Sequence, residues 1–225
     1  QTILVTGANR GIGFSIVQSM ATAAPNHTYI VGSRKIAAGE DAVRQLLAIE
    51  GLSSVHFEAL EIDILSDESV KKAVAEIESR FGGLDTLVNN AGMARIPKPD
   101  GSDLRDNFNQ TFATNVTATA ATTFSFLPLL KKTPAARVIN VSSSRGSLTL
   151  QTTGKLPPTA SIAYTASKSA LNVVTLEMQK LAPEVSFWAA CPGYCKTAFN
   201  GFRGKKDPLD GARVVRELAL SESGK

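Results

Sequence analysis

The sequence predicts an α/β fold in which a doubly wound parallel sheet is covered by helices on both faces. Short β-branched apolar runs alternate with longer helical patterns along the 225 residues, as in repeated βαβ units. Most of these runs are almost continuously apolar, as strands buried on both faces should be. No linker-like stretch interrupts the series, so residues 1–225 are expected to form a single domain.

Each expected strand is a short run rich in Val, Ile, Leu, Thr or aromatic residues. In chain order these runs are 2–6 (TILVT), 28–32 (TYIVG), 55–62 (VHFEALEI), 85–89 (DTLVN), 136–141 (ARVINV) and 185–190 (VSFWAA). Helical patterns are expected between and after them at 11–23, 37–50, 67–81, 103–131, 161–181 and 208–221. The uncharged run 107–130 is rich in Asn, Gln and Thr and contains Pro128, which favours a buried helix over a membrane span.

Composition and charge exclude several classes of protein. The net charge of +4 is mild and no basic run is interleaved with aromatic residues, so nucleic-acid binding is not expected. The opening residues lack the basic and apolar regions of a signal peptide. The two cysteines, Cys191 and Cys195, lie in one stretch (CPGYC) without a nearby His or further Cys. We therefore expect no metal site and free thiols in a reducing compartment, which indicates the cytoplasm.

A glycine-rich turn lies between the first expected strand and the first expected helix. In VTGANRGIGFSIV, Gly7, Gly11 and Gly13 have the spacing G-x-x-x-G-x-G. Gly7 permits a sharp turn off the strand, and the other two glycines let phosphates approach the backbone and the helix N-terminus. The alternative is a merely tight turn, but the position inside a βαβ unit favours a dinucleotide site.

Residues after the second strand indicate which dinucleotide is bound. A site for NAD(H) normally has an acid there for the ribose 2′-hydroxyl, whereas this chain has Ser33 and Arg34 and no acid until Glu40. Arg10 lies within the glycine turn. Two cations near the ribose favour a 2′-phosphate and hence NADP(H), although both arginines could instead be solvated surface residues.

Tyr164 and Lys168 lie four residues apart in SIAYTASKSAL, within an expected helix. Such a pair always shares one helix face. In one interpretation the tyrosine packs and the lysine reaches water. In the other, the ammonium lowers the pKa of the phenol so that Tyr164 can transfer a proton. The spacing alone does not decide between them.

Six motifs that occur in order along the chain favour the second interpretation, in which Tyr164 transfers a proton. They are TGANRGIG (6–13), NNAG (89–92), TNVTA (114–118), INVSSS (139–144), YTASK (164–168) and CPGYCKT (191–197). Together they resemble the short-chain dehydrogenase/reductase family, in its carbonyl-reductase-like, NADPH-dependent branch. The resemblance implies a Rossmann-like sheet of order 3-2-1-4-5-6, usually with a seventh strand.

The resemblance also implies the roles of individual residues. The catalytic tetrad is Asn115, Ser143, Tyr164 and Lys168, with Ser142 as the alternative serine because the run SSS leaves the register open by one. Asp63 resembles the acid that contacts the adenine amino group, and CPGYCKT resembles the segment that meets the nicotinamide amide. The full set implied to contact NADPH is Gly7, Asn9, Arg10, Gly11, Ile12, Gly13, Ser33, Arg34, Asp63, Ile64, Asn90, Ala91, Gly92, Tyr164, Lys168, Pro192, Gly193 and Thr197.

The sequence therefore predicts an NADPH-dependent oxidoreductase that reduces a small-molecule ketone or aldehyde. Two alternatives are a non-redox enzyme on the same scaffold, such as a cyclase, epimerase or dehydratase, and a non-enzymatic NADPH-binding sensor. The segment 198–210 has the glycines, aromatic residues and charge of a mobile substrate loop. The 21 positions from Ser143 to Tyr164 exceed the usual family spacing. That insertion leaves homodimer, homotetramer and monomer open.

Overall fold

The computed structural model describes residues 1–221, which form a six-stranded parallel sheet of order β3-β2-β1-β4-β5-β6. The strands are β1 (Thr2–Val5), β2 (Thr28–Ser33), β3 (His56–Glu61), β4 (Thr86–Asn89), β5 (Arg137–Val141) and β6 (Ser186–Ala190). The predicted fold class and strand order are confirmed. A seventh strand does not occur within residues 1–221.

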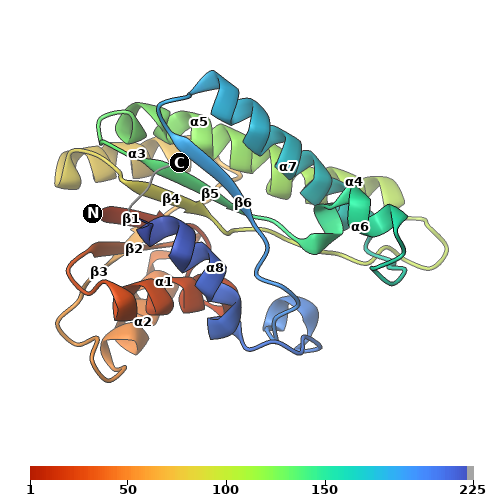
Figure 1. Cartoon of the computed structure of the whole chain (residues 1–225), viewed down its shortest axis with the longest axis horizontal. Helices are drawn as coiled ribbons and strands as arrows, with labels where there is room; N and C mark the ends of the chain where they lie inside the picture. The colour runs from red at the N-terminus through yellow and green to blue at the C-terminus, as the bar shows by residue number, and fades with distance from the viewer. Residues whose placement is uncertain (222–225) are drawn as a thin grey trace.

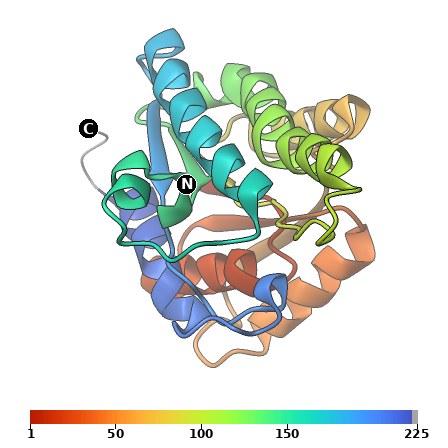
Figure 2. The ribbon, with the colours of Figure 1, turned by 90° about the vertical axis from the view of Figure 1, so that its right-hand side faces the viewer.

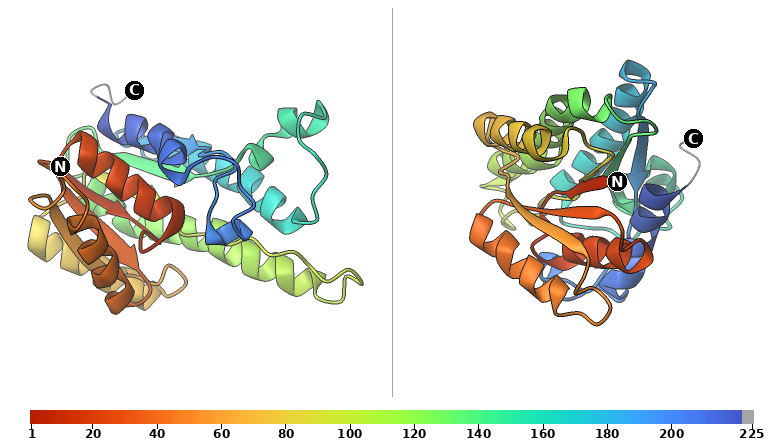
Figure 3. Two further views of the ribbon diagram at one scale, coloured as in Figure 1. Left: turned by 90° about the horizontal axis from the view of Figure 1, so that it is seen from below. Right: turned by 90° about the vertical axis from the view of Figure 1, so that its left-hand side faces the viewer.

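Helices cover both faces of the sheet (Figure 1). One face carries α1 (Gly11–Ala23), α2 (Ile36–Leu47) and α8 (Pro208–Leu220), and the other carries α3 (Asp67–Phe81), α5 (Thr119–Leu130) and α7 (Ile162–Leu181). Near the end of the sheet lie α4 (Leu104–Phe112) and the short helix α6 (Leu148–Thr152). Figure 3 shows the insertion that contains α6 extending beyond the sheet.

The alternating side chains of the central strand divide the interior into two cores. In β1, Ile3 and Val5 are fully buried in the core beneath α1 and α8, whereas Leu4 is fully buried in the core beneath α3 and α5. This follows from the two-residue period of a strand. Full burial of each such side chain stabilises the fold by about 1.5–3 kcal/mol.

Local capping sets the ends of the helices. At α3, the Ser66 hydroxyl accepts the Ser69 backbone N–H (3.2 Å), and Gly82 ends the helix in the left-handed region (φ 74°). At α8, the Asp207 carboxylate accepts the Leu209 N–H (2.8 Å).

A buried arginine fixes the far end of α8 to the sheet. Arg137, at the start of β5, is 3 % exposed and donates to the carbonyl oxygens of Ala219 (3.0 Å) and Ser221. The guanidinium thus pairs with the carbonyl groups that the end of a helix leaves without partners.

The helix expected at 103–131 is interrupted, which corrects the sequence prediction. A π-helical turn, η1 (Ala113–Ala118), separates α4 from α5. This turn contains Asn115, whose side-chain amide bonds to the backbone of Met93. Such local widening of a helix is frequent at functional sites. Within residues 1–221, no helix combines the length and apolar character needed to cross a membrane.

Candidate active site

The predicted site residues gather at the carboxyl end of the sheet. Figure 2 looks onto this end, where the segments that follow β1, β4, β5 and β6 lie close to one another. Ligands of open parallel α/β sheets bind at this end, where the strand order reverses. Here β1 and β4 are neighbours in the sheet although two strands and three helices lie between them in the chain.

The glycine turn has the geometry of a phosphate-binding turn. Gly7 and Gly11 both have positive φ angles (62° and 60°), which favour glycine. A Cβ added at Gly13 would lie 2.5 Å from Nδ2 of Asn90, so the helix packs closely on the neighbouring turn. In the described part of the chain, no side chain caps α1 and no acid stands in its first turn. The N–H groups of that turn can therefore receive an anion.

The NNAG turn supports the glycine turn from the neighbouring strand. Asn90 donates through Nδ2 to the carbonyl oxygens of Thr6 (2.9 Å) and Gly7 (3.1 Å). The Thr6 hydroxyl accepts the backbone N–H groups of Asn90 and Ala91, both at 3.1 Å. Asn90 thus holds the glycine turn in shape, and a Cβ at Gly7 would come within 3.0 Å of the Ala91 Cα.

Asn115 joins the segment after β4 to α7. Its Oδ1 accepts the Met93 N–H (2.8 Å), and its Nδ2 donates to the Met93 carbonyl (2.8 Å) and the Ser167 hydroxyl (3.0 Å). A Cβ at Gly92 would lie 3.1 Å from the same Oδ1. Both donors of the amide are used, which leaves one acceptor position on Oδ1.

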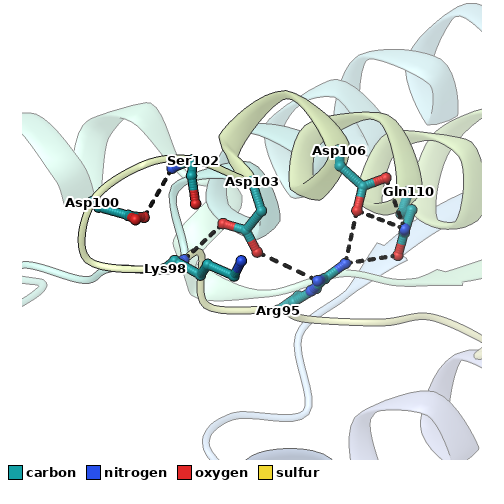
Figure 4. A network of polar contacts seen from close by, with 7 residues as sticks. All are labelled: Arg95, Lys98, Asp100, Ser102, Asp103, Asp106 and Gln110. Carbon is teal, nitrogen blue, oxygen red and sulfur yellow. Dashed lines mark hydrogen bonds and ion pairs between the residues drawn. The ribbon is translucent and has the colours of Figure 1, made fainter.

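A polar network around Arg95, which the sequence analysis did not predict, lies between the segment that follows β4 and helix α4 (Figure 4). Arg95 donates to Asp106 and Gln110 of α4, both at 3.1 Å, and to Asp103 at 3.3 Å. The Asp103 carboxylate also accepts the Lys98 backbone N–H (2.7 Å). Single exposed ion pairs contribute little to stability, but this network ties the segment 95–103 to α4 beside the site.

Ser143, Tyr164 and Lys168 form the centre of the site. The side chains of Ser143 and Tyr164 are hydrogen-bonded to each other. Lys168 is 6 % exposed, and its Nζ donates to the Val141 carbonyl (2.7 Å) and lies 5.7 Å from the centre of the Tyr164 ring. Ser142 instead donates to Asn172 of α7 (2.6 Å). Of the two serines that the sequence left open, Ser143 is the one that meets Tyr164.

Burial shifts the pKa values of both ionisable groups at this centre. Burial raises the pKa of Tyr164, the hydrogen bond from Ser143 lowers it, and the nearby thiol of Cys191 raises it. Burial also lowers the pKa of Lys168 to about 8, against a smaller raising effect of Cys191. The sequence interpretation gave the lowering of the tyrosine pKa to Lys168. In this structure Ser143 lowers the pKa of Tyr164, and Lys168 Nζ donates to the Val141 carbonyl. The effect of Lys168 on the pKa of Tyr164 stays a prediction.

At the second strand, the structure places one acid that the sequence did not indicate. Ser33 is buried at the end of β2, while the side chains of Arg34 and Arg10 are exposed and have no ion-pair partner within residues 1–221. Glu61 of neighbouring β3 accepts the Ile36 N–H (3.1 Å) and so caps α2. Strand pairing brings this acid to the turn, which no local pattern reveals.

Asp63 and Ile64 follow β3. The Asp63 Oδ1 accepts the Leu65 N–H (3.0 Å) in a local turn, and its side chain remains partly exposed. Ile64 is buried (8 % exposed) in the core beneath α3. Within the glycine turn, Asn9 is partly exposed and Ile12 packs against the core beneath α1.

The loop after β6 contacts both the glycine turn and Tyr164. A Cβ added at Gly11 would lie 3.8 Å from Cβ and Cγ2 of Thr197, so the first and last motifs lie side by side. The ring of Phe199 meets the ring of Tyr164 edge-on, with centres 5.9 Å apart. Gly193 has a φ of 85°, so this position also favours glycine.

Backbone pairing closes the base of this loop. Cys195 and Lys206 form a β-bridge, and the Lys196 N–H donates to the Lys206 carbonyl (2.9 Å). Lys206 also donates through Nζ to the Pro192 carbonyl (3.1 Å). A Cβ at Gly204 would lie 2.1 Å from the carbonyl of Cys195, so the two ends of the loop are in direct contact.

A buried amide network behind the site also went unpredicted. Asn89 donates to Thr123 and to Asn140, both at 2.8 Å, and Asn140 donates to Thr175 at 2.9 Å. It links β4 and β5 to the helices α5 and α7. The available signal was an Asn within an otherwise apolar strand, because a buried amide needs partners.

A family model described as short chain dehydrogenase matches residues 1–208. The chain belongs to this family. A short-chain dehydrogenase/reductase of Aspergillus fumigatus is 35% identical over 241 residues, covering 99% of this chain and 89% of that protein. The rat carbonyl reductase [NADPH] 3 is 32% identical, covering 96% of this chain and 90% of that protein.

Among solved structures, the NADPH-bound carbonyl reductase from chicken fatty liver is 26% identical with a TM-score of 0.79. The match covers 97% of this chain and 86% of that one. This short-chain dehydrogenase therefore shares its fold with carbonyl reductases, and the predicted family is confirmed.

Proposed function

We propose that this chain is an NADPH-dependent reductase that converts a ketone or an aldehyde into an alcohol. The observation that carries the proposal is the hydrogen bond between Ser143 and Tyr164, with the Lys168 ammonium 5.7 Å from the tyrosine ring centre. Two adjacent hydroxyl groups can bind one carbonyl oxygen together. The names of the rat and chicken relatives, which specify NADPH, support the same reaction.

In the proposed mechanism each side chain has one role. Tyr164 donates a proton to the carbonyl oxygen of the substrate. Ser143 donates a hydrogen bond to the same oxygen and stabilises the negative charge that develops there. Lys168 holds the hydroxyls of the nicotinamide ribose. Asn115 keeps one acceptor position for a water that connects Lys168 to solvent. When bound, NADPH supplies the hydride.

The remaining residues fit the cofactor as follows. The glycine turn and the start of α1 receive the pyrophosphate, because their N–H groups lack side-chain caps in residues 1–221. Asp63 has a partly exposed carboxylate for the adenine amino group. The segment with Pro192, Gly193 and Thr197 lies beside the glycine turn, where it can meet the nicotinamide amide.

Replacing Arg34 with alanine is expected to weaken NADPH binding about tenfold or more and NADH binding much less. The reason is that a charge-assisted hydrogen bond to the 2′-phosphate contributes about 1.5–3 kcal/mol. Dissociation constants for both cofactors, measured by fluorescence titration, check this, with Arg10→Ala expected to act in the same direction. Arg44→Ala removes an exposed arginine of α2 that pairs with Asp41 and serves as the control. Equal weakening of both cofactors would contradict the 2′-phosphate assignment.

We further propose that 198–210 is the substrate loop and that the substrate is an apolar or aromatic carbonyl compound. Phe199 and Phe202 expose 51% and 60% of their surface on this loop, and Phe199 touches Tyr164. Phe202 has a φ of 61°, a strained value for such a residue, and such strain gathers at ligand sites.

Replacing Phe199 with alanine is expected to raise KM about tenfold for aromatic ketones and to change it little for small aliphatic ones. The lost ring contact removes apolar area that only a large substrate buries. Steady-state kinetics on both substrate classes check this, and Phe124→Ala, which truncates an exposed phenylalanine of α5, is the control. The same KM change for both classes would show that Phe199 does not select the substrate.

The proposed function is tested by cofactor oxidation against a broad panel of ketones and aldehydes, with NADPH and NADH in parallel. Turnover that prefers NADPH supports it, and NADPH binding without any turnover contradicts it.

We also propose a cytoplasmic location, supported by the free thiols Cys191 and Cys195. A homodimer or homotetramer is proposed from the exposed apolar residues Val173 and Leu176 of α7, with a monomer as the alternative result of sedimentation.

A further inference from the structure

One face of α7 presents three polar side chains to the segment that follows β5. Tyr164, Lys168 and Asn172 are spaced four residues apart and therefore lie above one another on the helix. The first meets Ser143, and the second donates to the Val141 carbonyl (2.7 Å). The proposed mechanism gives roles to the first two residues only.

Asn172 holds the same segment on both sides of Ser143. Its Oδ1 accepts the Ser142 hydroxyl (2.6 Å), and its Nδ2 donates to the Gly146 carbonyl (3.1 Å). A carbonyl oxygen can only accept, so the nitrogen of the amide must face Gly146 and the oxygen must face Ser142. A Cβ at Gly146 would lie 2.7 Å from the Lys168 carbonyl, so the segment rests directly on α7.

The backbone between these two contacts is extended at Ser143 (φ −155°, ψ 151°). Successive side chains of an extended backbone point to opposite sides. With the Ser142 hydroxyl bound to Asn172, the Ser143 side chain is directed elsewhere and meets Tyr164, about two helical turns from Asn172 on the same face of α7. The amide contact thus determines which of two chemically identical residues becomes the partner of the tyrosine.

We propose that Asn172 is a positioning residue, which by binding Ser142 and Gly146 sets the register in which Ser143 contacts Tyr164. This inference rests on the proposed function, because Ser143 and Tyr164 act there on the substrate. It assigns to Asn172 no contact with substrate or cofactor. An amide suits the role because it offers one acceptor and one donor to two different partners.

The first experiment compares the parent protein with Asn172→Leu, which keeps the size of the side chain and removes both hydrogen bonds. We expect kcat to fall about tenfold or more, because the loss of both hydrogen bonds frees the segment that positions Ser143. The dissociation constant for NADPH should change less than twofold. Asn109→Leu, on the exposed surface of α4, is the matched control.

A second readout separates positioning from a merely structural role. Because the Ser143 hydrogen bond lowers the pKa of Tyr164, its loss should move the alkaline limb of the kcat profile to higher pH. The ultraviolet titration of Tyr164, isolated by subtracting that of Tyr164→Phe, should shift in the same direction without any substrate. Ser142→Ala removes the same contact from the other side with a smaller change, and keeps the test informative if Asn172→Leu folds poorly.

The outcomes are distinct. Unchanged kcat and unchanged titration in Asn172→Leu, or in Ser142→Ala should the first variant fail to fold, overturn the inference. Effects of the two variants that do not add in the double variant support it, because both remove one interaction. If the parent turns over no carbonyl compound while the Tyr164 titration still shifts, the proposed function is wrong and the positioning role of Asn172 stands.

Discussion

We expect Tyr164→Phe to lower kcat about 1,000-fold and to leave the affinity for NADPH close to that of the parent protein. The change removes one oxygen atom, which is the proposed proton donor, and general acid–base groups contribute typically about 10²–10⁴-fold. The ring keeps its packing against Phe199, so the fold should be preserved. NADPH oxidation with the best substrate of the panel and a fluorescence titration of NADPH measure the two quantities.

The chain offers a matched control for this variant. Tyr194→Phe makes the same chemical change at a tyrosine that is 57% exposed, and its activity should stay within twofold of the parent. Activity above a tenth of the parental value in Tyr164→Phe would show that another group delivers the proton. That result would remove the role of Tyr164 and leave the reductase activity in place.

Lys168→Met is expected to lower kcat about 100-fold or more and to remove a pH dependence of cofactor binding. Burial lowers the pKa of Lys168 to about 8, and the negative charge of NADPH should raise this pKa in the complex. At pH values between the pKa of Lys168 in the free protein and its pKa in the complex, Lys168 therefore takes up a proton when NADPH binds. By linkage, the affinity of the parent for NADPH falls as pH rises above about 8.

The measurement is the dissociation constant of NADPH from about pH 7 to about pH 9.5. In the parent it should rise at least about threefold over this range, and in Lys168→Met it should be higher at neutral pH and nearly constant. Tyr164 and Cys191 are the titratable groups near the ammonium, so Cys191→Ser tests whether the thiol contributes to the slope. If the dissociation constant still rises with pH in Lys168→Met, the pH dependence belongs to another group.

Sequence patterns predicted the elements well because those patterns act locally. All six strands and the helix at 11–23 lie within one or two residues of the expected bounds, since apolar runs and glycine turns mark them directly. The motifs also brought Ser143, Tyr164 and Lys168 to one place. Their family order, rather than any one spacing, made this possible.

The features that were missed depend on contacts between distant parts of the chain. Glu61 reaches the start of α2 only because β3 pairs with β2. The π-helical turn contains Asn115, which bonds to the distant Met93, and a helix pattern read along the chain does not contain such a contact. The choice of Ser143 over Ser142 depends on Asn172, because adjacent identical residues carry no local signal that separates them.

The bridge between Cys195 and Lys206 closes the loop at its base, so the residues between them can differ without moving the rest of the fold. Both ends are held by their mutual hydrogen bonds, so a different insert would neither shift the register of β6 nor displace the start of α8. Loop closure depends only weakly on length. Residues 198–203 can therefore change in length and composition without moving the elements on either side, while Gly204 is constrained by its contact with Cys195.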